Sequence, residues 1–569
     1  MNHDLPDSAP AEADLPLEDW PLRPWLLAVI GGLAGWIINL IVTSEGDGSF
    51  WAAICGFLFF GALAAGFVLR PRGWLEGAVF SLGLGLVMGG VAWLAVDSSD
   101  RYAGEPFAFS AGVFFSVLAV PLFQANFHRL RWATPYPETH FHVWTDAVSA
   151  GGAILFVGLA WLLLWLMHAL FSLIGIEVIE DLIQTDGFAG LFIGATFGAA
   201  MGVLRNQLSI IGTLQRVVML VFALLAVPFA AGVLIFLVIL LLTGGSALWE
   251  ATDSATPVLL ACALGCFVLA NAVFRDTDES RSQNVVMQAA ALVLAACIFP
   301  LTVFAAISMG LRIGQHGLSP ERIWALVAIA VATAYGLAYW VGLARGRLAG
   351  WAHYLRRANL HLAVGTCLVA LVLAFPLLDF GRISAANQVA RLNAGKVSAQ
   401  DFDYTALRWD FGDAGRRALA RLAAGEGEVA ELAQAAEAQT ERPYYDYQPE
   451  QRAEAEINLR VQPDDPEVRE FVLTRLRAES WRCSDYCVAV DLGENPAGVR
   501  EIALVENYSY EVWPMTGGAA DSAPVPISSR TPLGANSQVE VRTEPRRYIF
   551  IDGEQVGPAV EDGRFAPGM

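Results

Sequence analysis

The stretch GFAGLFIGATFGAAMGVL, residues 187–204, decides the architecture of this chain. Four glycines recur in it at every fourth position: Gly190, Gly194, Gly198 and Gly202. In a helix this spacing places them along one side, which then carries almost no side chains. In water such a helix would be poor, because each Gly costs about 1 kcal/mol relative to Ala. In lipid, however, a bare stripe lets a neighbouring backbone approach closely. The spacing therefore predicts a helix-packing face, a glycine zipper, at the centre of a membrane bundle.

The composition agrees with a membrane protein, because 55% of the 569 residues are apolar, only 16% are charged, and the mean hydropathy is +0.47. An apolar helix needs about 20 residues to cross a hydrocarbon core of roughly 30 Å. We predict an all-α polytopic bundle of about 11 transmembrane helices, and we count residues 216–243 as one kinked span, although two spans remain open there. The apolar runs lie at residues 25–42, 50–69, 74–96, 106–126, 147–174, 187–204, 216–243, 256–274, 285–310, 323–343 and 359–378.

Four regions follow from the changes in composition. Residues 1–22 form a proline-containing acidic tail that we expect to be disordered. Residues 23–379 form the bundle. Residues 380–445 predict a helical neck, with Ser384 and Ser398 as N-caps of its first two helices. Residues 446–569 predict a soluble α+β domain from strand-like alternation in CVAVDL, VREIALVE, SYEVW, QVEVRT and RRYIFIDG, the last with a hairpin signal at Asp552-Gly553.

The arginines predict the orientation in the membrane, because cytoplasmic loops carry an excess of basic residues. With eleven spans and the N-terminus inside, one side of the membrane receives 13 of the 16 basic residues that precede Phe380, and the other side receives 3. We therefore predict a multi-pass protein of the bacterial inner membrane with a cytoplasmic N-terminus. Its C-terminal domain would then be periplasmic or extracellular.

Three stretches resemble a known family: residues 143–176 (VWTDAVSAGGAILFVGLAWLLLWLMHALFSLIGI), 317–340 (GLSPERIWALVAIAVATAYGLAYW) and 377–419 (LLDFGRISAANQVARLNAGKVSAQDFDYTALRWDFGDAGRRAL). They are similar to the bacterial multi-pass membrane family catalogued as domain of unknown function 4153. The resemblance covers roughly residues 20–425. It implies no known activity, cofactor or catalytic residue.

Several kinds of chemistry can be set aside. The only lysine, Lys396, is followed by Val397, so the chain has no phosphate-binding Gly-Lys-Ser/Thr loop and we expect no nucleotide. A net charge of −20 argues against nucleic acid as a partner. None of the eight histidines lies after residue 361, which excludes a Ser-His-Asp or His-zinc site in the soluble domain. We predict no cofactor, no metal and no catalytic residue.

Five residues are weaker functional candidates. His168 shares a helical face with Trp161 and Trp165, and we interpret it as part of the aromatic belt at the outer interface rather than as a ligand or proton relay. Pro228 and Pro300 interrupt two spans and could unwind them around a transport cavity, although prolines are also common in packed membrane helices.

The other two candidates, His140 and His142, lie in FHRLRWATPYPETHFHVWTDA, residues 127–147, which we predict to be an interfacial elbow on the cytoplasmic face. With Glu138 and Asp146 they could gather a metal, but the spacing lacks a helical His-x-x-x-His pair and a simple elbow is favoured. No Asp, Glu, Arg or Lys lies near the middle of any predicted span, so coupled transport loses support.

Cys483 and Cys487 are the only cysteines outside the apolar segments. We predict a disulfide between them in an oxidising compartment. A regular helix across WRCSDYC would orient the two thiols poorly, so the prediction also requires a turn there.

Three functions remain open. The favoured hypothesis is a non-enzymatic envelope protein whose outward-facing C-terminal domain binds an envelope protein or a lipid-like ligand. The alternative is a carrier or flippase for a neutral or amphipathic substrate, with a cavity near Pro228 and Pro300. A membrane enzyme that uses His168, or His140 and His142, comes third. The last prediction is that Gly194→Leu destabilises the bundle more than Gly187→Leu does, because Gly187 lies at the outer end of its span.

Overall fold

The structure is a computed structural model, and it divides into two compact units, Met1–Arg442 and Pro443–Met569, which we describe separately. The predicted disordered tail and the QVEVRT strand fall almost wholly outside the described residues. The structure describes residues 20–44, 46, 48–97, 101–244, 255–442, 457–477, 483, 486–495, 498–506, 509–515, 525–526, 539, 550–551 and 554–555.

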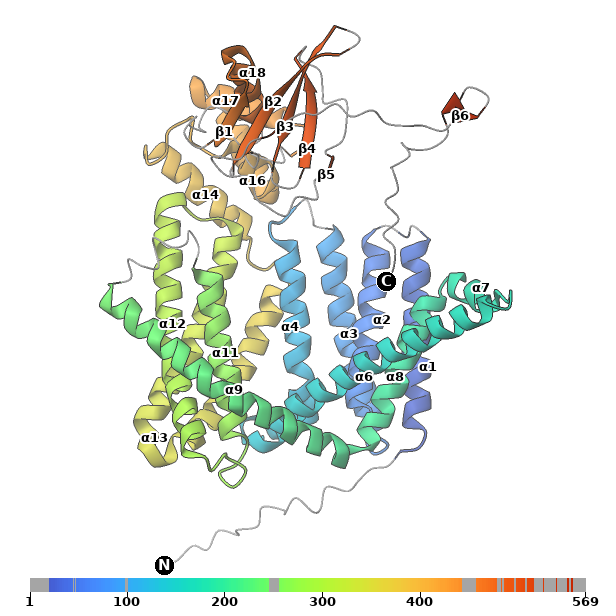
Figure 1. Cartoon of the computed structure of the whole chain (residues 1–569). Coiled ribbons are helices and arrows are strands. Elements are labelled where there is room, and N and C mark those ends of the chain that lie inside the picture. Colours follow the sequence, from blue (N-terminus) through green and yellow to red (C-terminus); the bar gives the residue numbers. More distant parts are fainter. Residues whose placement is uncertain are drawn as a thin grey trace, which may run out of the picture. The chain divides into compact units, whose positions relative to one another are not determined.

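The first unit is helical throughout its described part (Figure 1). Its elements are α1 (Arg23–Thr43), α2 (Ser49–Val68), α3 (Trp74–Asp97), α4 (Glu105–Gln124), α5 (Phe127–Leu130), η1 (Arg131–Ala133), α6 (Tyr136–Ser172), α7 (Val178–Gln184), α8 (Phe188–Asn206), α9 (Leu208–Leu242), α11 (Thr256–Phe274), α12 (Val285–His316), α13 (Pro320–Leu373), α14 (Phe380–Asn393), α15 (Tyr404–Trp409), α16 (Gly412–Ala423) and α17 (Glu428–Glu437).

Eleven helical segments in the described part of the chain are long and apolar enough to cross a membrane, which confirms the predicted fold class. Helix α13 supplies two of them, joined at a kink where Arg347 has a φ of 50°. Helix α9 continues through Pro228 and counts as one span. Helix α6 begins at Tyr136, so the prediction of an elbow up to residue 147 is wrong in its second half. Pro137 lies in the first turn of α6, where the missing N–H costs nothing.

The glycines of α8 lie against the backbone of α1. A Cβ atom added at Gly194 would overlap the carbonyl oxygen of Gly31, and one added at Gly190 would overlap that of Gly35. A Cβ atom added at Gly198 would overlap the carbonyl oxygen of Leu27, and one added at Gly202 would overlap the Cα atom of Pro24. Each step of four residues along α8 thus matches a step of three or four residues backwards along α1, as two antiparallel helices in direct backbone contact require.

Gly187 differs from the sequence-based expectation for the end of this span. It has a φ of 82°, and an added Cβ would overlap the ring of Trp36. A substitution there is therefore strained by its backbone and also blocked by a side chain. Gly187→Leu is not the mild comparison that the sequence suggested.

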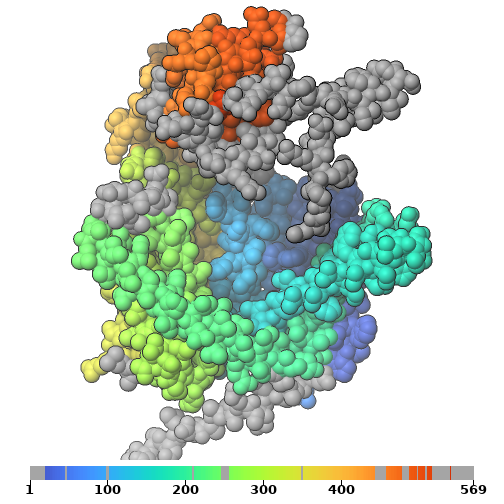
Figure 2. Space-filling model, viewed as in Figure 1, coloured from blue at the N-terminus to red at the C-terminus, as the bar shows by residue number. Residues whose placement is uncertain are grey.

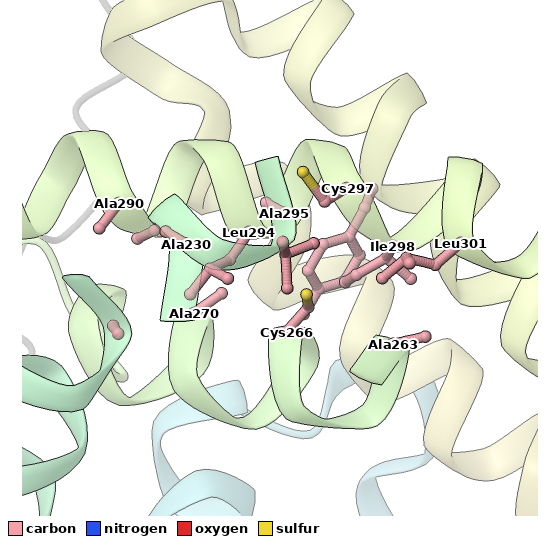
Figure 3. Close-up of a cluster of buried hydrophobic side chains, with 14 of the residues drawn as sticks. Ala230, Ala263, Cys266, Ala270, Ala290, Leu294, Ala295, Cys297, Ile298 and Leu301 are labelled. Atoms are coloured by element: carbon pink, nitrogen blue, oxygen red, sulfur yellow. The ribbon is translucent and has the colours of Figure 1, made fainter. Parts of the chain in front are cut away.

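The largest apolar core of the first unit joins α9, α11, α12 and α13. Small residues on α11 and α12 bring these helices close together, and larger ones such as Leu294 and Ile298 fill the space between them (Figure 3). Cys266 and Cys297 lie inside this core as buried thiols, consistent with their behaving as small apolar side chains.

The neck packs within the first unit. Its first two helices are capped by Asp379 and Asp403, whose carboxylates accept from backbone N–H groups. The prediction of Ser384 and Ser398 as caps is therefore wrong, because each acidic residue stands directly before its helix and accepts the same bonds. Helix α14 holds the end of α12 and the turn that follows it: Arg391 donates to the carbonyls of Gly314 and Gln315, and Asn387 accepts from the N–H of Leu318.

The second unit contains a five-stranded sheet in the order β1-β2-β3-β4-β5 and a two-stranded hairpin. Strand β1 pairs with β2 in parallel through the crossover helix α18, and the other pairs are antiparallel. The elements are β1 (Leu459–Gln462), α18 (Pro466–Arg477), β2 (Cys487–Glu494), β3 (Arg500–Val505), β4 (Ser509–Pro514), β5 (Val525–Pro526), β6 (Phe550–Ile551) and β7 (Glu554–Gln555).

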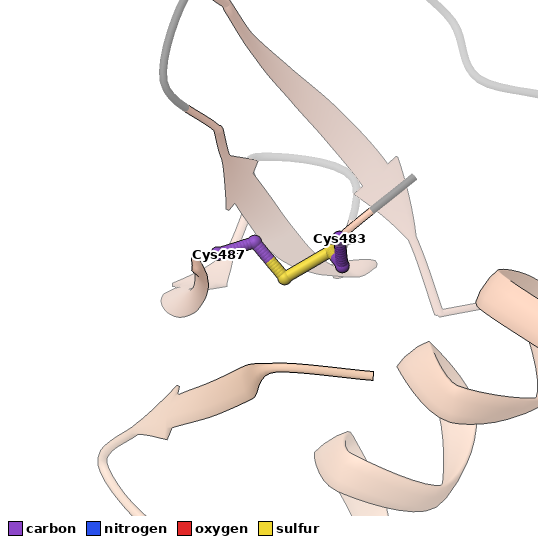
Figure 4. The surroundings of a disulfide bond; sticks show 2 residues. All are labelled: Cys483 and Cys487. Atoms are coloured by element: carbon purple, nitrogen blue, oxygen red, sulfur yellow. A yellow bond between two sulfur atoms is a disulfide. The ribbon is translucent and has the colours of Figure 1, made fainter. Parts of the chain in front are cut away.

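Two cross-links hold this unit together. The guanidinium of Arg500 on β3 donates to Asp491 and Asp465, and these hydrogen bonds lower the pKa of both carboxyl groups. Cys483 is joined to Cys487 by a disulfide with a Cα–Cα distance of 5.4 Å (Figure 4). Cys483 has a φ of 52°, so the backbone at this position is not that of a regular helix.

Candidate functional site

The first four turns of α6 carry a polar face inside the bundle. This face reaches three neighbours: α4 through Gln124, α9 through Gln215 and α11 through Asn271. Such a concentration of polar groups within a membrane bundle is costly and is typical of a functional site. Its members are the buried Thr139, His140, Thr145 and Ser149 and the half-buried Tyr136, His142 and Asp146.

We call Gln124, Asp146 and Ser149 the Asp146 cluster. The Nε2 group of Gln124 donates to the carbonyl oxygen of Phe67 at 2.8 Å and to Oδ1 of Asp146 at 3.2 Å. Gln124 Oε1, Asp146 Oδ2 and Ser149 Oγ are buried and have no hydrogen-bond partner within the described part of the chain. Each buried atom left in this way costs about 1–3 kcal/mol. These three atoms, two of them one helical turn apart on α6 and the third on the side chain that bonds Asp146, leave hydrogen-bonding capacity that nothing in the described part of the chain fills.

A second polar group lies beside it and is internally satisfied. Asn271 Nδ2 donates to the hydroxyl of Tyr339 at 2.8 Å, and that hydroxyl donates to Asn359 Oδ1 at 3.0 Å. Asn359 Nδ2 donates to Asn271 Oδ1 at 2.8 Å and to Tyr136 at 3.2 Å. This ring of side chains ties α6, α11 and both halves of α13 together, and a fully satisfied network of this kind fixes one arrangement of the helices.

Arginines close several helix C-termini at the same end of the bundle. Arg205 donates to the carbonyl of Gly66 at 2.8 Å, Arg23 donates to that of Arg205 at 3.0 Å, and Arg356 donates to that of Phe274 at 2.7 Å. A cation is favourable there because helix C-termini carry partial negative charge. Some of the arginines that the predicted topology places on the cytoplasmic side therefore also serve to bond helix C-termini.

Apolar stripes lead to the Asp146 cluster along α4 and α6. On α4, Phe114 is 51% exposed and Val117 is 61% exposed, and Gln124 follows Val117 by seven residues, on the same helical face. On α6, Phe156 is 48% exposed and lies seven residues beyond Ser149, again on one face. Each stripe is thus apolar and exposed at its outer end, and polar and buried at its inner end.

Helices α4, α6 and α9 border a hollow (Figure 2). Helices α6 and α9 diverge from a crossing where Thr145 donates to Oε1 of Gln215 at 3.3 Å and the rings of Trp144 and Phe222 lie 5.7 Å apart (Figure 1). None of the most apolar 18-residue stretch of α6 is buried within the unit. Figure 2 shows the surface hollowed between α6 and α9, with the blue region around α4 set back behind them.

The structure separates the two histidine candidates. His140 lies between Tyr136 and Trp144, with ring centroids 5.6 and 6.2 Å away, and its Nε2 is buried without a partner among the described residues. His142 lies on the face of Asp146 and Ser149, four and seven residues before them, and its ring centroid is 5.6 Å from that of Phe141. The alternative of a metal at this elbow is not supported, because the described residues contain no group of three His, Cys, Asp or Glu side chains that could hold one.

The remaining candidates lie apart from the Asp146 cluster. His168 packs edge-on against Trp165 near the end of α6, with ring centroids 5.5 Å apart. Pro228 and Pro300 lie inside helices α9 and α12, which stay helical through them, so neither proline marks an unwound segment.

Gln124, Asn271, Tyr339 and Asn359 are residues of this region that the sequence analysis did not select. Single amides and phenols in apolar runs carry no signal on their own, and the hydrogen-bond partners within the ring lie 20 to 223 residues apart in the sequence. Asp146 and Ser149 did have a signal: with Thr139 and His142 they repeat at helical spacing.

Comparison with known proteins gives one match. A family model described as "Domain of unknown function (DUF4153)" matches residues 57–422, from α2 to the end of α16. No curated protein and no solved structure matches the chain. The matched region contains both polar groups and the neck up to residue 422, and it spans well over half of the 569 residues. The chain therefore belongs to the DUF4153 family of domains of unknown function.

Proposed function

We propose that this protein is a lipid carrier of the bacterial inner membrane, which takes a membrane lipid into the hollow between α6 and α9. The proposal rests on the change from exposed apolar residues to buried polar atoms along α4 and α6. Exposed apolar residues such as Val117 and Phe156 lead on one helical face to the buried polar atoms of the Asp146 cluster. A membrane lipid has the same order, with acyl chains joined to a polar head.

The polar end distinguishes this hollow from an ordinary lipid-facing surface. Any membrane helix exposes apolar side chains to acyl chains, but a carboxylate and an amide at the end of such a stripe are expensive to bury. Their retention is explained if a ligand completes their hydrogen bonds. Helices α4, α6 and α9 all lie within residues 57–422, so the elements that form the hollow belong to the family's shared region.

Partner binding by the C-terminal domain becomes the second candidate. The family match ends at residue 422 and so does not include that domain. A function common to the family would have to reside in the membrane unit and neck. The orientation with the N-terminus inside remains part of the proposal, supported by the arginine distribution.

Reconstitution tests the carrier function. The purified protein is placed in vesicles that contain a trace of phospholipid with a fluorescent acyl chain, and a membrane-impermeant quencher reports how fast the lipid of the inner leaflet becomes accessible. We expect exchange faster than in protein-free vesicles. Val117→Trp, which adds bulk to the exposed apolar stripe of α4, should slow it, whereas Val29→Trp on α1, where the parent residue is similarly exposed (58% against 61%), should not. Exchange no faster than in protein-free vesicles would refute the proposal.

A further inference from the structure

We infer that the Asp146 cluster binds the primary ammonium of a zwitterionic phospholipid head group. This inference rests on the proposed lipid-carrier function and names its substrate class. The cluster offers three buried oxygens without partners in the described structure: Asp146 Oδ2, Gln124 Oε1 and Ser149 Oγ.

The chemistry of these atoms selects a donor. A carboxylate oxygen and an amide carbonyl oxygen only accept hydrogen bonds, and a serine hydroxyl can accept as well as donate. The amide of Gln124 is fixed in this orientation, because its Nε2 already donates to Phe67 and to Oδ1 of Asp146. A primary ammonium carries three N–H donors and a positive charge, so it matches three acceptors of which one is a carboxylate.

The same atoms disfavour other head groups. A quaternary ammonium such as choline has no N–H to donate, so the three oxygens would stay without partners. A free phosphate carries a charge of the same sign as Asp146, so the carboxylate would repel it. Discrimination against an analogue that lacks the required donor is strong in sites whose buried polar groups would otherwise remain unpaired.

Arg205 does not occupy the cluster. Arg205 on α8 lies close enough to Asp146 to interact with its charge, but its NH1 group donates to the carbonyls of Gly66 and Leu69. Arg205 and Asp146, both of which the structure describes, form no ion pair with an N–O distance of 4.0 Å or less. Asp146 thus remains available to an ammonium, and the positive potential of Arg205 favours the phosphodiester that accompanies the ammonium in such a head group.

Two lipid probes that differ in one feature test the inference. Acyl-labelled phosphatidylethanolamine and acyl-labelled phosphatidylcholine have the same net charge, but only the first has N–H donors. We expect the purified full-length protein in detergent, followed by fluorescence anisotropy, to bind the ethanolamine lipid roughly tenfold more tightly, because a hydrogen bond to a charged group is worth about one such factor. Asp146→Asn and Ser149→Ala should each reduce the preference. Asp181→Asn, at an exposed site on α7, should leave it unchanged.

Each outcome decides a different point. Equal binding of the two lipids by the parent protein would overturn the ammonium site and leave the carrier proposal standing. Binding of neither lipid would overturn both.

Free ethanolamine serves as a competitor, and we expect it to leave the lipid bound because it lacks acyl chains. Displacement of the lipid by ethanolamine at equal concentration would show that the cluster takes a soluble amine, against the inference. A melting temperature for each variant confirms that it has folded.

Discussion

Substitution of Gly194 tests the contact between α1 and α8, from which the architecture follows. An added Cβ would overlap the carbonyl oxygen of Gly31 and lie 2.6 Å from its carbonyl carbon. Carbon atoms in contact normally lie about 3.5–4.0 Å apart, so the two helices must separate by about 1 Å. A gap of that size forfeits a quarter to a half of each contact's attraction along the interface. Overpacking of this kind typically costs about 1–3 kcal/mol.

Gly194→Ala should therefore lower the melting temperature in detergent, and Gly194→Leu should lower it further and reduce the yield of folded protein. Helix propensity acts in the opposite direction, because Ala is favoured over Gly by about 1 kcal/mol. The matched control is Gly83 on α3, which is exposed and has no atom within 4 Å of an added Cβ. Gly83→Ala and Gly83→Leu should be neutral or stabilising. A Gly194→Leu protein as stable as the Gly83→Leu protein would refute the close contact.

Three further predictions concern other parts of the chain. Protein isolated without reductant should contain Cys483 and Cys487 as a disulfide, so alkylation before reduction should add no mass at either position, and free thiols would contradict this. Alkaline phosphatase fused after Gly381 should be active and a cytoplasm-only fluorescent reporter dark, whereas the reverse pattern would overturn the proposed topology. Tyr339→Phe should lower the melting temperature, because one N–H of Asn271 and the Oδ1 of Asn359 lose the hydroxyl that they bond, at a cost of about 1–3 kcal/mol, whereas Tyr354→Phe at an exposed position should not.

The parts of the fold that depend on local patterns could be predicted from the sequence. The apolar runs predict the eleven spans because a helix crosses the membrane by length and composition alone. Proline at residue 228 leaves the count unchanged, since a helix can continue through a proline when its neighbours compensate. The start of α6 was missed because polar residues dominate its first turns, although Pro137 in that first turn is a helix-start signal.

The candidate site depends on contacts that no local pattern contains. Asn271 and Tyr339 are single polar residues in apolar runs, and their importance appears only when α11 and α13 bring them within 2.8 Å. The absence of charged residues near the centre of each span does not reveal this site either. Asp146 lies before the apolar run of its helix, yet α4 and α6 enclose it, because α6 begins ten residues earlier.

The depth of the Asp146 cluster also bears on how a carrier would work. The cluster lies at the end of the bundle where Arg23, Arg205 and Arg356 close helix C-termini, whereas the exposed stripes of α4 and α6 run away from that end. A bound lipid would therefore place its head at the arginine side and its acyl chains toward the bilayer centre, which is the orientation of a lipid in the leaflet on that side. Under the proposed topology this is the cytoplasmic leaflet. The reporter fused after Gly381 thus decides the loading leaflet as well as the orientation, since an inverted protein would load from the outer one.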